Sequence, residues 1–121
     1  MKKNKSHLFS LTLLLIAGLV LAGCAPAEEL PIEQNGEVIV FMQNNTFQPA
    51  ELTIPAGTTV TWTNEDIVDH TATSGTRGSP TGIFDETVGP GGTFSFTFDE
   101  AGTYGYFCSI HPGMDGVVFV E

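Results

Sequence analysis

Beyond residue 36 the sequence consists of short stretches in which apolar and polar side chains alternate. The alternation is clearest in Thr58–Asn64 and Thr93–Phe98, and such a pattern predicts strands with one buried face. Turn residues recur about every 8–12 residues, and no long helical period occurs after residue 23. These features predict an all-β domain, a Greek-key β-sandwich of about seven or eight strands. The aromatic residues expected in its core are Phe41, Phe47, Trp62, Phe94, Phe96, Phe98, Tyr104 and Phe119.

Eight stretches are compatible with strands, and the turn residues between them set their approximate ends. Their ranges are 37–43, 47–54, 58–64, 70–73, 83–88, 93–98, 103–108 and 116–120. Pro49 should mark an edge or a bend within the second of them. The segment 74–82 is rich in Gly, Ser, Thr and Pro, and is expected to form a long surface loop.

The N-terminal segment has the features of an export signal. A lysine-rich start precedes an apolar run, residues 8–20, that is too short for a membrane span and ends in small residues. The following Leu-Ala-Gly-Cys motif, which ends at Cys24, resembles a bacterial lipobox. The resemblance implies cleavage before Cys24 and lipidation of that cysteine. The alternative is an ordinary signal peptide, with Cys24 as a bystander or as a disulfide partner of Cys108.

This interpretation divides the chain into a lipoprotein signal peptide over residues 1–23, a lipidated tether over residues 24–36 and a folded domain over residues 37–121. The tether contains proline and glutamate with little apolar content, which is typical of a linker. The protein is expected to be exported and to be held by its acyl chains on the periplasmic or extracellular face of a membrane, without spanning it.

Cleavage of residues 1–23 would leave 98 of the 121 residues, with Arg77 as the only Lys or Arg side chain. Against all 14 Asp and Glu residues this gives a formal charge of −13. A domain without a basic patch cannot displace the counterions of nucleic acid, so nucleic acid is not an expected partner. An acidic surface would favour basic partners, although plain solubility or adaptation to a salty medium would give the same composition.

Three metal-donor side chains follow one another near the C-terminus. Cys108, His111 and Met114 are separated by two residues each, between two expected strands. Thiolate and thioether sulfur favour copper, and imidazole suits it; a blue copper site also needs a second histidine. His70 is the candidate, because the remaining histidine, His7, belongs to the expected signal peptide. The donor set therefore predicts a copper site.

Residues 104–116, with the sequence Tyr-Gly-Tyr-Phe-Cys-Ser-Ile-His-Pro-Gly-Met-Asp-Gly, carry a specific resemblance. Together with residues 60–64 and 69–71 they resemble the cupredoxins, the family of small blue copper proteins, over residues 37–121. The short spacing between His111 and Met114 resembles that of amicyanin-like members rather than plastocyanins. A lipid-anchored copy also resembles the membrane-attached halocyanins.

The resemblance implies one type 1 copper ion that cycles between Cu(I) and Cu(II). The implied ligands are His70, Cys108, His111 and, in the axial position, Met114. It also implies one-electron transfer between membrane-associated redox complexes, without enzymatic activity. The implied partners are redox proteins, such as a c-type cytochrome, an oxidase or another copper enzyme, and the carrier is expected to be a monomer.

The surroundings of the ion are also implied by the resemblance. The family places the second loop histidine near an apolar surface, so His111 is the expected electron exit, with Pro112 and Met42 beside it. Many members have Asn directly after the first histidine, where it braces the cysteine loop. This chain has Thr71, whose hydroxyl can still donate a hydrogen bond but has a different reach, so we expect a different tuning of the site. Gly113 and Gly116 should permit tight turning of the loop.

Several alternatives to an electron carrier are open from the sequence. A copper chaperone or store would exchange the ion itself, and such proteins offer exposed Met- or Cys-rich ligands, which this chain lacks. A domain of a copper oxidase or nitrite reductase would need further histidine clusters, and a zinc site would make poor use of a methionine. The acidic residues Glu65, Asp66 and Asp69 match no calcium loop and are interpreted as a solvated loop.

Overall fold

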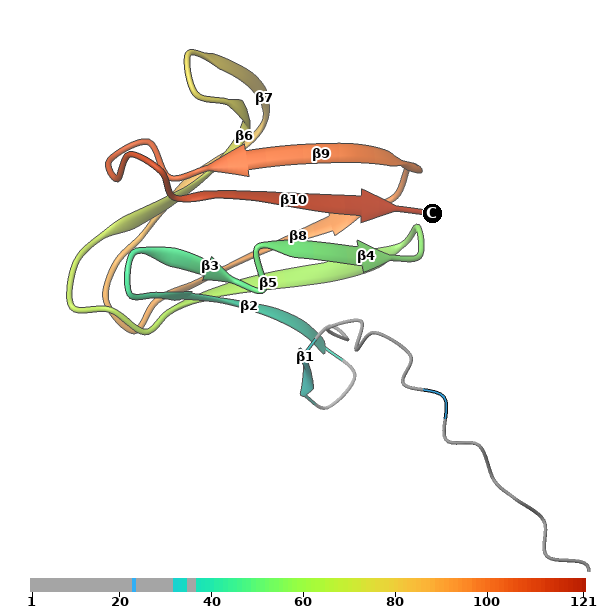
Figure 1. Cartoon of the computed structure of the whole chain (residues 1–121), viewed down its shortest axis with the longest axis horizontal. Helices are drawn as coiled ribbons and strands as arrows, with labels where there is room; N and C mark the ends of the chain where they lie inside the picture. The colour runs from blue at the N-terminus through green and yellow to red at the C-terminus, as the bar shows by residue number, and fades with distance from the viewer. Residues whose placement is uncertain (1–22, 24–31, 35–36) are drawn as a thin grey trace, which may run out of the picture.

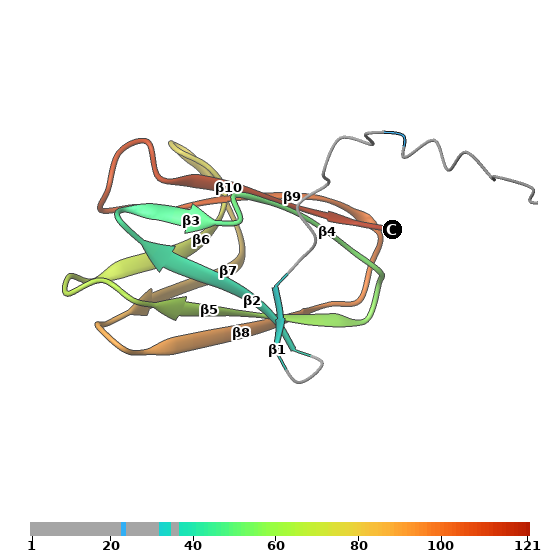
Figure 2. The same cartoon turned by 60° about the horizontal axis from the view of Figure 1, so that its bottom comes forward.

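The structure is a computed structural model that describes residue 23 and residues 32–34 and 37–121. Within these residues, ten strands form two sheets that pack face to face (Figure 1 and Figure 2). The strands are β1 (Ile32–Gln34), β2 (Glu37–Gln43), β3 (Thr46–Gln48), β4 (Glu51–Ile54), β5 (Thr58–Asn64), β6 (His70–Thr76), β7 (Ser79–Val88), β8 (Thr93–Phe98), β9 (Gly102–Phe107) and β10 (Asp115–Val120). The expected all-β sandwich is confirmed. The two additional strands arise because β1 joins the set and because residues 47–54 are divided at Pro49 into β3 and β4.

The order of the strands brings distant parts of the chain together. The first sheet has the order β1-β2-β5-β8, with β3 paired to β2, and the second has the order β4-β10-β9-β6-β7. β2 and β5 run parallel, as do β4 and β10, whereas the other neighbours are antiparallel. As a result, the β2–β3, β5–β6 and β9–β10 connections lie at the same end of the sandwich (Figure 1).

Trp62 of β5 lies in the core between the sheets. Its side chain is fully buried, and its ring centroid lies 5.3–6.4 Å from the centroids of Phe84, Phe94, Phe98 and Tyr106. These separations fall in the range of favourable aromatic pairs. Phe84 and Tyr106 extend the set of core aromatics expected from the sequence.

Phe119 is an exception to the expected core. Its side chain is 38% exposed, whereas Val118 and Val120 on either side of it are buried. Successive side chains of a strand point to opposite faces of the sheet. Because β10 turns Val118 and Val120 inward, Phe119 must point outward, and its assignment to the core is wrong.

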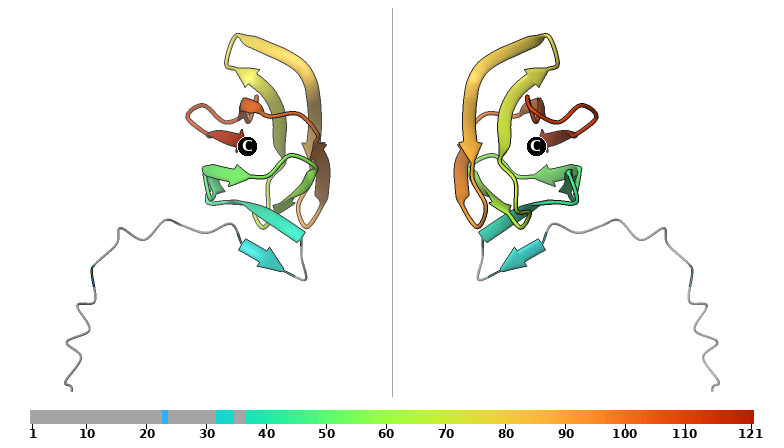
Figure 3. Two further views of the ribbon diagram at one scale, coloured as in Figure 1. Left: turned by 90° about the vertical axis from the view of Figure 1, so that its right-hand side faces the viewer. Right: turned by 90° about the vertical axis from the view of Figure 1, so that its left-hand side faces the viewer.

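The predicted long loop over residues 74–82 is also wrong. β6 continues to Thr76 and β7 begins at Ser79, and the two strands form a hairpin that extends beyond the rest of the sandwich (Figure 3). Gly75 has a φ of +110° at a register shift between the strands, and a Cβ atom there would lie 2.5 Å from the Ser79 carbonyl oxygen. Gly78, with a φ of +88°, lies in the turn. The glycines that suggested a loop therefore serve a β-bulge and a tight turn.

Apart from Gly23, the expected signal peptide lies outside the described residues, and so does Cys24. β1 falls within the range expected to be a tether and pairs antiparallel with β2. In the part of the chain that the structure describes, no helix has the length and apolar character needed to cross a membrane.

Candidate metal centre

Two connections at one end of the sandwich carry the predicted ligands. The connection after β5 leads into His70, the first residue of β6, and the connection between β9 and β10 carries Cys108, His111 and Met114. His70, Cys108 and Met114 are buried, and His111 is half-buried. The sandwich thus brings His70 to the C-terminal donor loop although 38 residues separate it from Cys108.

Asn64, at the end of β5, fixes the connection that leads to His70. The side chain is buried, and its Nδ2 atom donates hydrogen bonds of 2.8 Å to the carbonyl oxygens of Val68 and Val88. Its Oδ1 atom accepts a hydrogen bond of 2.9 Å from the amide of Asp66. One side chain therefore closes the β5–β6 connection and links it to the end of β7.

The donor loop between β9 and β10 is closed by its own backbone. The amide of Cys108 donates to the carbonyl oxygen of Met114 at 2.9 Å, and the amide of Met114 donates to that of His111 at 3.3 Å. Gly113 has a φ of +83°, which confirms its expected role in the turn. These bonds hold the ends of the loop together, so that Cys108 and Met114 both enter the hydrophobic core.

The three nearest donor atoms lie close enough to bind one ion. The Nδ1 atoms of His70 and His111 are 3.1 Å apart, and the Sγ atom of Cys108 lies 3.9 Å from the first and 3.5 Å from the second. An ion bound at about 2.0–2.3 Å from nitrogen and sulfur needs donors roughly 3–4 Å apart. Cys108 is a free cysteine, and the three donors are the group of possible metal ligands found among the described residues. This geometry fits a single metal ion.

Thr71 contacts both the sulfur atom and the donor loop. Its amide donates to Cys108 Sγ at 3.3 Å, and its Oγ1 atom accepts a hydrogen bond of 2.7 Å from the amide of Ser109. Behind it, Thr73 Oγ1 donates to the Asp85 carboxylate at 2.9 Å and lies 3.0 Å from Thr71 Oγ1. The Oγ1 atom of Thr71 also donates to Ser109 Oγ at 3.2 Å. Thr71 therefore both accepts from and donates to Ser109, which ties the start of β6 to the donor loop.

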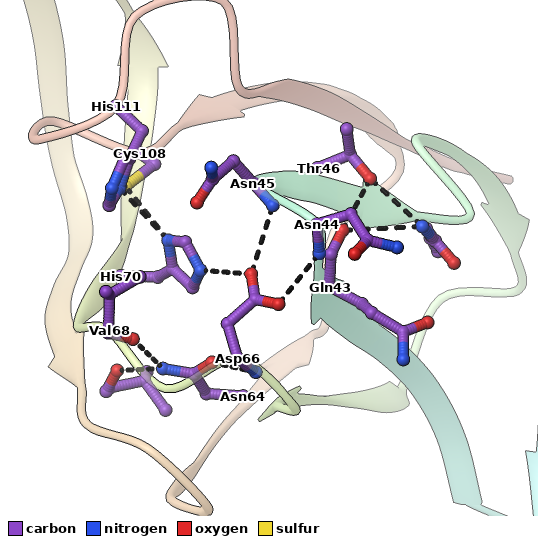
Figure 4. A network of polar contacts seen from close by, with 12 residues as sticks. Gln43, Asn44, Asn45, Thr46, Asn64, Asp66, Val68, His70, Cys108 and His111 are labelled. Atoms are coloured by element: carbon purple, nitrogen blue, oxygen red, sulfur yellow. Dashed lines mark hydrogen bonds and ion pairs between the residues drawn. The ribbon is translucent and has the colours of Figure 1, made fainter.

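Asp66 contacts Nε2 of His70, the ring nitrogen that does not face Cys108 (Figure 4). Its Oδ2 atom lies 2.8 Å from His70 Nε2 and accepts a hydrogen bond of 3.0 Å from the amide of Asn45, while its Oδ1 atom accepts one of 2.8 Å from Asn44. The bond from the Asn45 amide lowers the pKa of the Asp66 carboxyl group. The bonds from Asn44 and His70 act in the same direction, and burial opposes them. The interpretation of Asp66 as part of a solvated loop is therefore wrong.

The Asp66 contact also determines the tautomer of His70. An ionised carboxylate only accepts hydrogen bonds, so His70 Nε2 must carry the proton. The Nδ1 atom of the neutral ring is then unprotonated and faces His111 and Cys108. A ring held in this way presents a free lone pair to a metal ion.

Two residues expected at the site have other places or roles. Met42 is fully buried, so it does not lie on a surface beside His111, whereas Pro112 is exposed. Gly116 does not have a positive φ; instead, a Cβ atom there would lie 2.4 Å from the Tyr106 ring. Its hydrogen side chain therefore makes room for an aromatic ring rather than for a turn.

Two charged contacts at the site, those of Asp66 and Arg77, are not predicted by the sequence patterns. Arg77 donates hydrogen bonds to the backbone carbonyl oxygens of Cys108 and His111. Its signal in the sequence is that no other Lys or Arg follows residue 5. Asp66 has only a weak signal, its position four residues before His70.

The metal-binding geometry at this end of the sandwich agrees with the similarity of the chain to known proteins. Residues 35–121 match the family described as copper binding proteins, plastocyanin/azurin family. The chain belongs to this family. Copper is accordingly its cofactor, and His70, Cys108, His111 and Met114 are arranged as in a type 1 copper site of the plastocyanin/azurin family.

Individual members of the plastocyanin/azurin family resemble nearly the whole chain. Amicyanin-alpha of Methylorubrum extorquens is 36% identical over 117 residues, which cover 93% of this chain and 90% of the amicyanin. Chloroplastic plastocyanin of Tetradesmus obliquus is 34% identical over 115 residues, covering 88% of this chain and 75% of the plastocyanin. The solved structure of a purple cupredoxin from Nitrosopumilus maritimus superimposes with a TM-score of 0.63 and 34% identity, over 69% of this chain and 98% of that one.

Proposed function

We propose that this protein is a blue copper electron carrier in which His70, Cys108 and His111 hold the ion and Met114 is a weak axial ligand. The bound ion supplies one-electron chemistry by cycling between Cu(II) and Cu(I). The observation that carries the proposal is the grouping of two Nδ1 atoms and one Sγ atom within 4.8 Å of one another. A mixed thiolate and imidazole set of this kind serves both oxidation states of copper.

The residues around the donor atoms limit how far these atoms move when the bound copper changes its oxidation state. Asp66 fixes the His70 ring, Thr71 donates to the Cys108 sulfur, and the backbone of the donor loop is hydrogen-bonded at both ends. A donor arrangement held by its surroundings reorganises little during electron transfer, which favours fast exchange. Hydrogen bonds to the sulfur also tune the reduction potential.

His111 is the proposed electron exit, with Pro112 beside it. The His111 ring is half-buried and Pro112 is exposed, and the neighbouring Ile110 is 51% exposed. Small apolar surfaces of this kind are suited to brief contacts with another protein. The proposed partners are redox proteins such as a c-type cytochrome, an oxidase or another copper enzyme, and the carrier acts as a monomer.

A copper chaperone or store is the second candidate function. The burial of His70 and Cys108, both 0% exposed, favours a carrier, because a chaperone must hand its ion to another protein. We further propose that the protein is not itself an enzyme. Among residues 37–121, a single group of three or more His, Cys, Asp or Glu residues could hold a metal, which supports one electron-transfer site without a second, catalytic copper.

The proposed place of the carrier is the periplasmic or extracellular face of a membrane. We propose residues 1–23 as the signal peptide, Cys24 as the lipidated residue and residues 24–36 as the tether, as the sequence predicts. Metabolic labelling with a radioactive fatty acid should label the wild-type protein, and Cys24→Ala should abolish both the label and the recovery with membranes. Recovery of unlabelled wild-type protein in the soluble fraction would contradict the anchor.

Copper titration of residues 32–121, followed by visible absorption and voltammetry, tests the proposed function. An intense charge-transfer band with reversible one-electron behaviour is expected, and Cys108→Ser should abolish the band. A colourless complex that releases copper readily to a chelator would instead support the chaperone. A band that persists in Cys108→Ser would remove this thiolate from the ligand set.

A further inference from the structure

Arg77 is the only Lys or Arg after residue 5 of the sequence, and it lies beside the donor loop. It occupies the turn between β6 and β7, next to Gly78. The bulge at Gly75 breaks the register of β6 and β7 just before this turn. The hairpin therefore places the one permanent positive charge of the described residues at the metal centre, in a strongly acidic chain.

The guanidinium group of Arg77 holds the backbone of the donor loop. Its Nη1 atom donates to the carbonyl oxygen of Cys108 at 3.0 Å, and its Nη2 atom donates to that of His111 at 3.2 Å. Nη2 also donates to Asp115 Oδ1 at 3.3 Å. The guanidinium carbon lies 5.2 Å from the ring centroid of Phe107. Arg77 thus contacts the residue before the donor loop, two donor residues within it and the residue that follows Met114.

The contacts with carbonyl oxygens matter more than the ion pair. The side chains of Arg77 and Asp115 are 38% and 60% exposed, and an ion pair in such a position contributes little because water and salt screen it. A planar, permanently charged fork, in contrast, can bond two carbonyl oxygens in fixed directions and stack on an aromatic ring. Charge-assisted hydrogen bonds of this kind are stronger than neutral ones.

We propose that Arg77 is a positioning residue that closes the donor loop before copper binds and raises the reduction potential of the bound copper. This inference rests on the proposed electron-carrier function. Because Cu(II) carries one more positive charge than Cu(I), a fixed cation beside the ligands destabilises the oxidised form more. The hydrogen bond to the Cys108 carbonyl acts in the same direction, since it draws electron density away from that residue.

The test uses three variants of the protein. Arg77→Met removes both the charge and the fork, whereas Arg77→Lys keeps the charge and loses the planar fork. Ala101→Glu is the matched control, because it lowers the net charge by the same amount as Arg77→Met. Ala101 is exposed between β8 and β9, at the end of the sandwich opposite to the donor loop (Figure 1).

Two quantities should change in Arg77→Met and stay unchanged in Ala101→Glu. In the copper-free protein, the amides of Cys108 and Met114 should exchange with solvent about tenfold faster, because the loop opens more often. In the copper-loaded protein, the ratio of Cu(I) to Cu(II) at a fixed potential should fall about tenfold, which equals ~59 mV for a one-electron couple. Arg77→Lys should show the faster exchange, while its potential should fall by less than that of Arg77→Met because the charge is kept.

Wild-type exchange rates and a wild-type potential in Arg77→Met would overturn the inference. Equal shifts of the potential in Arg77→Met and Ala101→Glu would also overturn it, because they would assign the effect to net charge alone. A failure of the proposed function looks different. In that case the wild-type protein itself lacks the charge-transfer band, while the exchange experiment on the copper-free protein still reports on Arg77.

Discussion

The carboxylate of Asp66 lies 2.8 Å from Nε2 of His70, on the side of the imidazole ring that faces away from Cys108. The same carboxylate accepts the amides of Asn44 and Asn45, two residues with positive φ in the β2–β3 turn. A turn in one sheet is thereby coupled to a ligand in the other sheet. The position of His70 consequently depends on the β2–β3 and β5–β6 connections as well as on β6 itself.

Replacement of Asp66 by Asn should weaken copper binding. Each carboxylate oxygen of Asp66 accepts a backbone amide, whereas an asparagine side chain has only one oxygen. Its NH₂ group would therefore face the amide N–H of Asn44 or Asn45. Loss of a carboxylate behind a ligating histidine commonly lowers metal affinity about 10–100-fold, and we expect a change in this range from chelator competition. Glu65→Gln is the matched control, because the exposed Glu65 carries the same charge next in sequence. Equal copper affinities of the two variants would show that Asp66 has no part in holding His70.

Replacement of Thr71 by Val should destabilise the copper-free protein. The change keeps the shape of this buried residue but removes the only side-chain acceptor of the Ser109 amide. A buried donor left without its partner costs about 1–3 kcal/mol, and Thr71→Ser should recover most of this loss. Denaturant unfolding measures the change. Thr59→Val, at an exposed hydroxyl that bonds Thr97, should alter the unfolding free energy by less than ~0.5 kcal/mol.

The charge-transfer band offers a second measurement on the same variants. The hydrogen bond to Cys108 Sγ comes from the backbone amide of Thr71, which Val also possesses. Thr71→Val should therefore keep the wild-type band position while it loses stability. A large shift of the band in this variant would mean that the hydroxyl, rather than the amide, controls the environment of the sulfur.

Local patterns in the sequence predict the strands and the donor set, whereas contacts between distant connections escape them. Alternation identifies β5 and β8, and the spacing of Cys108, His111 and Met114 identifies the donor loop, because each is encoded within a few residues. The partner of Asp66 depends on which turns meet at one end of the sandwich. That arrangement is set by strand order, which a local pattern does not contain.

Glycine shows the same limit of sequence reasoning. Gly113 takes a positive φ in the loop, as expected, but Gly75 and Gly78 mark a hairpin rather than a loop, and Gly116 is required by its neighbour. Composition indicates that the backbone needs freedom or space at these positions. It does not indicate whether the glycine is required by a turn, by a bulge or by an aromatic ring from another strand.

Replacement of Gly116 by Ala should destabilise the sandwich. Gly116 pairs with Tyr106 across β10 and β9, and a Cβ atom would lie 2.4–2.8 Å from atoms of the Tyr106 side chain. The buried Tyr106 ring also packs against Trp62 and Phe47, so it cannot move away freely. Overpacking of this kind costs about 1–3 kcal/mol, and denaturant unfolding of the copper-free protein should show this loss.

The control for this substitution is Gly89→Ala. The nearest atom to a Cβ at Gly89 would be a side-chain oxygen of Asp69 at 3.5 Å, an ordinary contact. This variant should be neutral or slightly more stable, because Ala restricts the unfolded chain. Equal stabilities of Gly116→Ala and Gly89→Ala would show that the Tyr106 ring adjusts without cost.

Replacement of Ile110 by Ser should slow electron exchange between molecules without a change in reduction potential. Ile110 is 51% exposed beside the proposed exit at His111. Burial of its side chain against a redox partner would stabilise the complex in which the electron is transferred. Loss of about 1 kcal/mol of apolar contact corresponds to roughly a fivefold lower rate. Stopped-flow measurement against a one-electron redox protein gives the rate, and voltammetry gives the potential. Ile83→Ser is the matched control, since Ile83 is 47% exposed but lines a pocket with Asp99 and Tyr104 that includes no residue of the donor loop. If both variants exchange electrons at the wild-type rate, the partner does not dock around His111.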